Sequence, residues 1–198
     1  MNRSLKCQCG TVQGQMKDIE KSRRIVCYCK DCQAFAHYLG KAGSLLDEQG
    51  GSNILVSQPQ QLEFTAGVDA IASMSLSERG MLRWYASCCN TPIGNTPRTR
   101  AMSFIGLSPL CLADHGNNLD SDFGPVRMVS FTEGAKGKVA GTGIRALPVM
   151  IGLGVALLRS RLSGRYRGNL FFKADTGEPI VAPTVLAKAE HERLRALG

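Results

Sequence analysis

The stretch Cys27-Tyr28-Cys29-Lys30-Asp31-Cys32-Gln33 places three thiols in a C-x-C-x2-C spacing. Cysteines this close together can direct their sulfurs towards one point, which suits a thiophilic metal ion. Zn²⁺ binds thiolates at roughly 2.3 Å in a tetrahedral array, and a site with three protein ligands keeps its fourth position for water or substrate. We therefore expect Cys27, Cys29 and Cys32 to form an open zinc site.

Four further cysteines lie in two short groups that are far apart in the sequence. Cys7 and Cys9 stand near the start of the chain, and Cys88 and Cys89 are adjacent in its middle. Together they could supply the four thiolates of a closed, structural zinc site. Adjacent cysteines start out in different directions, but a left-handed residue can re-aim one of them, and Asn90 tolerates that conformation. We expect two zinc ions per chain.

A disulfide framework is the main alternative for a chain with eight cysteines. Such frameworks belong to small secreted proteins in oxidising compartments. Residues 1–6 contain no apolar signal-peptide core, and no run reaches the ~18 apolar residues of a membrane-spanning helix. We therefore favour metal binding and expect a soluble, cytoplasmic protein. Cys111, isolated between two leucines, is typical of a small core residue.

Composition and turn spacing predict a mainly β protein. The 198 residues are 43% hydrophobic and 20% charged, which suffices for one good core. A hairpin over 5–16, a strand over 24–27 and a short helix over 33–39 closed by Gly40 are expected first. Short β-prone runs then alternate with the turn residues Pro59, Gly67, Gly80 and Pro92, which favours an antiparallel architecture. These runs are 54–57, 61–65, 71–76, 81–85, 102–107 and 126–131, with an exposed loop over 114–124.

The last third of the chain carries the excess of positive charge. The formal net charge is +8, and residues 134–174 hold eight Lys and Arg but no Asp or Glu. The sequence of residues 144–162 predicts a helix that is apolar almost all round. Such a helix is expected to be buried in the protein's own core or in the contact of a homodimer. Its basic flank also suits a membrane surface. Thr184 is placed to cap a final, solvent-facing helix.

The order and spacing of the cysteines resemble the glutathione-dependent formaldehyde-activating enzymes and their centromere protein V relatives. That family begins with C-x-C-G, here residues 7–10, continues with C-x-C-x2-C-Q, here residues 27–33, and later carries an aromatic residue before C-x2-C-G-x-P. The likeness covers roughly residues 4–105. The third motif corresponds to residues 84–92. Cys89 holds its second cysteine position, but Ala86 stands at the first cysteine position and Asn90 at the glycine. Either Cys88 replaces the missing thiol or the structural site lacks a ligand.

The resemblance implies a β-tent of small antiparallel sheets tied by zinc, followed here by an appended α-helical segment. It also implies carbon–sulfur lyase chemistry of the S-(hydroxymethyl)glutathione synthase type, with glutathione or another small thiol as partner. A three-thiolate zinc can hold an incoming thiol as thiolate, and a basic surface suits anionic glutathione. His37, five residues after Cys32, is a candidate for proton transfer; the catalytic residues are otherwise unassigned.

We divide the chain into a zinc-binding β-tent domain over 1–132 and a basic, partly helical extension over 133–198. The same residues leave a second class of function open, that of a binding module. The metals could serve the fold alone, and the extension could dock an acidic partner or a membrane surface. Its aromatic side chains are sparse, with Tyr166, Phe171 and Phe172 alone, which argues against a base-stacking surface for nucleic acid.

Overall fold

A computed structural model describes residues 2–112 and 119–198, and within these ranges the chain is mainly β. The strands are β1 (Arg3–Lys6), β2 (Gln13–Met16), β3 (Arg23–Cys27), β4 (Ser52–Ser57), β5 (Leu62–Ala66), β6 (Ile71–Ser75), β7 (Leu82–Ala86), β8 (Thr91–Thr96), β9 (Ile105–Leu107), β10 (Met128–Ser130) and β11 (Thr184–Val185). The α-helices are α1 (Lys30–Tyr38), α2 (Ala42–Leu45), α3 (Leu119–Phe123), α4 (Leu147–Leu162) and α5 (Lys188–Ala196).

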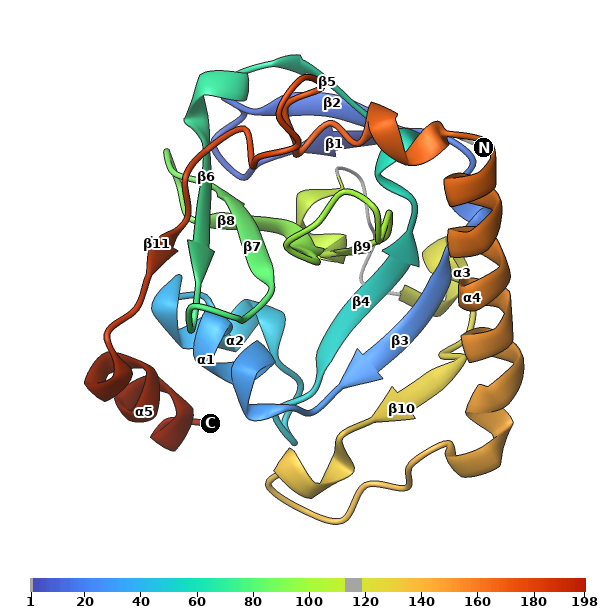
Figure 1. Cartoon of the computed structure of the whole chain (residues 1–198). Coiled ribbons are helices and arrows are strands. Elements are labelled where there is room, and N and C mark those ends of the chain that lie inside the picture. The colour runs from blue at the N-terminus through green and yellow to red at the C-terminus, as the bar shows by residue number, and fades with distance from the viewer. Residues whose placement is uncertain (1, 113–118) are drawn as a thin grey trace.

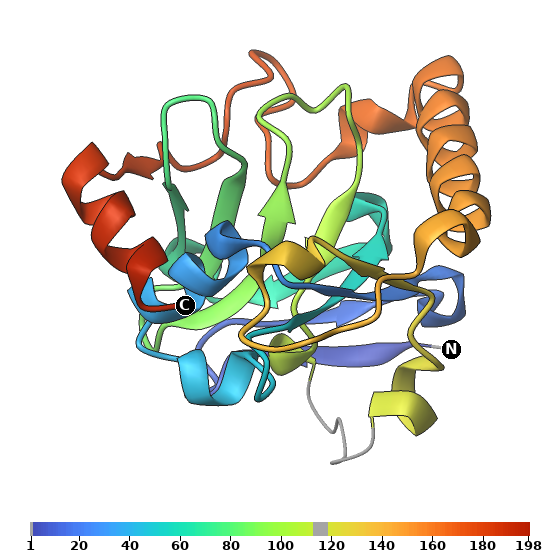
Figure 2. The ribbon, with the colours of Figure 1, turned by 90° about the horizontal axis from the view of Figure 1, so that it is seen from below.

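The strands form two sheets, as Figures 1 and 2 show. The smaller sheet has the order β1-β2-β5, and the larger has the order β10-β3-β4-β9-β8-β7-β6-β11. The larger sheet curves, so that β6 and β7 stand opposite β3 and β4, and the smaller sheet lies across one end of it (Figure 1). The predicted mainly β, tent-like fold with a helical C-terminal segment is confirmed. Neighbouring strands are antiparallel except at the two outer edges, where β10–β3 and β11–β6 are parallel.

The main hydrophobic core fills the space between the two sheets. Leu5 of β1, Met16 of β2 and Trp84 of β7 are all fully buried there. Phe171, from the last third of the chain, joins them and lies against Trp84 with ring centroids 4.8 Å apart. Each such side chain stabilises the fold by roughly 1.5–3 kcal/mol through burial. Residues on both sides of position 132 therefore share one core, while the division into two domains stays a prediction.

Strand β8 was not expected from the sequence, because Pro92 was interpreted as a turn residue. Pro92 lies inside the strand and pairs with Tyr85 where the register shifts between Trp84 and Tyr85. Such an irregularity tolerates proline, because one residue there is left out of the hydrogen-bonded ladder. The expected hairpin is confirmed as β1–β2, with Gly10 at its bend at φ +83°.

The helices follow the expectations in part. α1 begins before residue 33, so that Cys32 lies in its first turn, and Gly40 ends it at φ +65°. Of the loop expected over 114–124, residues 114–118 lie outside the described residues and Leu119–Phe123 forms α3. Thr184 as an N-cap is wrong, because it pairs with β6 as part of β11 and the N-cap of α5 is Ala187.

The expectation that the apolar helix is buried in the protein's own core is wrong. α4 lies on the outside of the molecule (Figure 1), and within this helix Ser160 alone is buried. Together with the preceding turn it spans Gly143–Leu162, a segment long and apolar enough to cross a membrane by length and composition, of which 6% is buried. A contact between two copies and a contact with a membrane surface both stay predictions.

Candidate metal centres

The first cysteine group joins the two sheets. Cys7 and Cys9 lie in the turn between β1 and β2, which belong to the smaller sheet, whereas Cys88 and Cys89 lie in the turn between β7 and β8 of the larger sheet. The sulfurs of all four lie within 4.8 Å of one another. A metal ion held here would tie the sheets together at one point.

The spacing of these sulfurs fits a tetrahedral zinc site. Zinc–sulfur bonds of about 2.3 Å place the sulfurs roughly 3.8 Å apart. The Sγ–Sγ distances are 3.5 Å for Cys7–Cys9, 3.2 Å for Cys9–Cys88, 3.8 Å for Cys7–Cys88 and 3.9 Å for Cys88–Cys89. Asn90 adopts the left-handed conformation at φ +54°, as anticipated. The structure thus places Cys88 beside the three other thiols, in the position left open by the alanine at residue 86.

Neighbouring donors support this group. The backbone N–H of Val12 donates to the sulfur of Cys7 over 3.2 Å. The Thr11 hydroxyl lies 3.2 Å from the sulfur of Cys9, and this hydrogen bond lowers the pKa of Cys9 to about 6. Hydrogen bonds to metal-binding sulfurs orient them and tune their basicity. Cys9 is therefore a thiolate at neutral pH and suited to bind a cation.

The second group is built at the junction of β3 and α1. Cys27 is the last residue of β3, Cys29 is the N-cap of α1, and Cys32 follows in the first helical turn. Their three sulfurs lie within 4.8 Å of one another, and the Cys32 N–H donates to the Cys29 sulfur over 3.4 Å. Across residues 2–112 and 119–198, no fourth His, Cys, Asp or Glu completes this group. The group could hold a metal ion with one position free for another molecule.

Without a metal, these thiols are protonated at neutral pH. The hydrogen bond with Cys29 raises the pKa of Cys27 to about 11, and the hydrogen bond with Cys27 raises the pKa of Cys32 to about 11. A metal ion must therefore displace protons from the sulfurs, which makes its binding dependent on pH.

The turn that carries this group is fixed by Gln33. Its side chain is fully buried, and its amide donates to the carbonyl oxygens of Tyr28 over 2.8 Å and Gly134 over 2.9 Å. The Tyr28 hydroxyl in turn donates to Asp47 over 2.9 Å. Gln33 thus positions the cysteines against the turn that follows β10.

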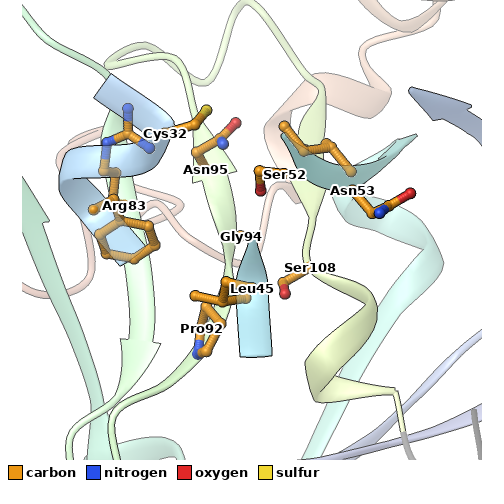
Figure 3. Close-up of a pocket in the computed structure, with 12 residues that line it drawn as sticks. Cys32, Leu45, Ser52, Asn53, Arg83, Pro92, Gly94, Asn95 and Ser108 are labelled. Carbon is orange, nitrogen blue, oxygen red and sulfur yellow. The ribbon is translucent and has the colours of Figure 1, made fainter. Parts of the chain in front are cut away.

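A small recess opens beside Cys32 (Figure 3). Arg83 from β7, Asn95 from β8 and Ser108 line it together with Cys32, and its volume of about 30 Å³ has room for one small polar group. In Figure 3, side chains from the helix and from both strands converge on this space.

Arg83 is the residue that sequence reasoning missed. Its side chain is 5% exposed and its guanidinium lies over the Phe35 ring, 5.2 Å from the centroid. The ion pairs found among the described residues include none with Arg83. A buried, unpaired charge is costly, so its retention points to a ligand. The signal in the sequence was a cation between Leu82 and Trp84, two core residues of one strand.

His37 is not among the grouped ligands and does not line the recess. Its Nε2 is buried, and among the described residues it has no hydrogen-bond partner. A role for His37 in proton transfer stays a prediction.

Fold and site together define a mainly β protein with two cysteine clusters that could hold metal ions. The chain belongs to a family of unknown function (DUF6151), which matches residues 2–180. No curated protein matches the sequence. A crystal structure of a Rhodobacter sphaeroides protein, a Northeast Structural Genomics target, is similar at 17% identity and a TM-score of 0.40, covering 64% of this chain and 97% of that one.

Proposed function

We propose that Cys27, Cys29 and Cys32 hold a zinc ion with an open position, and that the protein forms or cleaves carbon–sulfur bonds in adducts of glutathione with a small aldehyde. The observation that carries this proposal is the three-thiol group without a fourth protein ligand in the described residues, next to a recess that holds an unpaired guanidinium. The family resemblance in the first two cysteine motifs supports the same chemistry.

The reaction needs no oxidant or reductant. Zinc, when bound, supplies a Lewis acid that holds an incoming thiol as thiolate at neutral pH. The sulfur then adds to the carbonyl carbon of the aldehyde, and the electron pair of the C=O bond moves to its oxygen, which takes up the proton that the thiol released. The product is a hydroxymethyl thioether when the aldehyde is formaldehyde, and the reverse sequence of steps cleaves it.

Residues around the recess have roles that follow from their positions. Arg83 offers a desolvated positive charge to a carboxylate of glutathione, and charge-assisted hydrogen bonds of this kind are roughly twice as strong as neutral ones. Asn95 and Ser108 line the same space and carry donors that could hold the same carboxylate. The first cysteine group, in this proposal, serves the fold.

A cobalt-substituted protein tests the proposal directly, because the absorption of Co²⁺ changes when a thiolate enters its coordination shell. Glutathione should perturb the spectrum of wild type and of Cys9→Ser, which leaves the three-cysteine group intact, but not that of Cys32→Ser. The same variants should be compared for adduct formation between labelled formaldehyde and glutathione, followed by nuclear magnetic resonance. A protein that binds two metal ions but shows no spectral response to glutathione would refute the proposal.

A second candidate function is a non-catalytic, zinc-stapled binding module. The observation that favours it is the exposed apolar helix α4 within a segment that lacks acidic residues. A binding role of α4 alone would leave the first proposal intact, since α4 does not line the recess beside Cys32.

A further inference from the structure

We propose that α4 docks on the surface of an anionic lipid bilayer, with its outer face in the boundary between headgroups and acyl chains. This inference goes beyond the proposed function and does not depend on it. It is carried by three observations: the outer face is apolar, the inner face is partly covered by the protein, and the flanks are cationic.

The outer face of α4 is a continuous apolar stripe. Its members recur every three or four residues, which places them on one side of a helix. Most are more than half exposed: Leu147 at 53%, Met150 at 54%, Ile151 at 57%, Val155 at 41%, Leu158 at 58% and Leu162 at 79%. Single exposed apolar residues need no explanation, but a contiguous row of this length marks a surface that binds something.

The opposite face of α4 rests on the body of the protein. Val149, Leu153 and Leu157 are partly covered, and Ser160 is buried. The Gln58 side chain donates to the carbonyl oxygen of Ala156 over 3.4 Å. The helix is therefore partly covered along one side and exposed along the other. It can lie flat on the surface, which is how interfacial helices bind.

The positive charge around α4 favours an anionic bilayer as its partner. Arg145 precedes the helix, Arg159 and Arg161 occupy its last turn, and Arg165 and Arg167 follow in the next turn. All five arginines are exposed, and residues 134–174 contain no Asp or Glu. Each cation close to an anionic bilayer strengthens binding roughly fivefold.

A second copy of the chain fits this surface less well. A two-fold interface brings the same patch of both subunits together. The arginines of one copy would then meet those of the other, with no acidic residue from the segment to pair with them. An anionic membrane meets both the apolar stripe and the cations.

Vesicle sedimentation of the full zinc-loaded chain tests this proposal. Vesicles of phosphatidylcholine with phosphatidylserine should carry the protein down at low salt, and those of phosphatidylcholine alone should not. The triple variant Ile151→Gln, Val155→Gln, Leu158→Gln should weaken binding at least tenfold. These positions are exposed, so the fold should persist, which the fluorescence of Trp84 can verify. Val68→Gln, a change at an equally exposed apolar residue on another part of the surface at 46%, is the matched control.

The arginines are tested in the same assay. Replacing Arg159, Arg161 and Arg165 by Gln should reduce binding on the order of 100-fold, and high salt should release the wild-type protein. Three results would overturn the proposal: no binding to anionic vesicles, equal binding to neutral ones, or release by detergent alone and not by high salt. A salt-resistant dimer that the triple apolar variant abolishes would assign the surface to a second copy instead.

Discussion

Replacing Phe171 by alanine tests whether the last third of the chain belongs to the same core as the strands that flank the first cysteine group. The ring is fully buried, lies 4.8 Å from Trp84 between centroids, and meets Phe64 edge-on at 6.0 Å. Removing a buried phenyl ring costs about 3–5 kcal/mol, of which the aromatic pairs account for roughly 0.5–1.5 kcal/mol each. We expect Phe171→Ala to lower the free energy of unfolding by about 4 kcal/mol.

The assay uses a probe that the protein already carries. Trp84 is the single tryptophan of the chain, so urea unfolding followed by its fluorescence reports on this contact. Zinc is kept in excess so that metal loss does not contribute. Phe131→Ala is the control, because that ring is 57% exposed and should change the stability by less than about 0.5 kcal/mol. A loss below about 1 kcal/mol in Phe171→Ala, with the emission of Trp84 unchanged, would show that the shared core is wrong.

Three further outcomes are expected. Cys88→Ala should lower the zinc content and the melting temperature as much as Cys89→Ala does; if the change at Cys89 alone has this effect, Cys88 is not a ligand. Arg83→Met should weaken glutathione binding to the cobalt protein by about 10-fold or more, while uncharged 2-mercaptoethanol binds as before. The melting temperature should rise, because a buried charge without an acidic partner is removed. Equal loss of binding for both thiols would contradict this role. Burial raises the pKa of Cys111 to about 12, so the folded state keeps a proton that the unfolded state loses above about pH 9. Stability therefore falls as the pH rises from about 9 to about 12. Urea titrations should show the advantage of wild type over Cys111→Val shrinking across this window.

The sequence was most informative where chemistry is local. Cys27, Cys29 and Cys32 are brought together by one strand end and one helical turn, so their spacing alone predicts the group. The left-handed conformation of Asn90 could also be predicted, because asparagine tolerates it and it can re-aim one of two adjacent cysteines.

Expectations failed where long-range packing decides the outcome. Pro92 looked like a turn residue, but a register shift opposite it admits proline to a strand. The apolar pattern of α4 predicted burial, yet hydrophobicity along a helix cannot say whether the covering surface belongs to the same chain. The local sign of Arg83, a cation between two core residues, did not suffice to assign its role, because its burial depends on strands and on α1, which the sequence does not place relative to one another.

The two cysteine groups differ in how much of the chain must be synthesised between their first and last cysteines. Cys27, Cys29 and Cys32 leave the ribosome almost together, so a metal ion could bind them at once. Cys7 and Cys88 are 81 positions apart, and at roughly 5–20 residues per second the later thiol follows about 4–16 s after the earlier one. During that interval Cys7 and Cys9 lack the two sulfurs that complete their group. A metal ion held by this group can therefore tie the two sheets together only after Cys89 has left the ribosome.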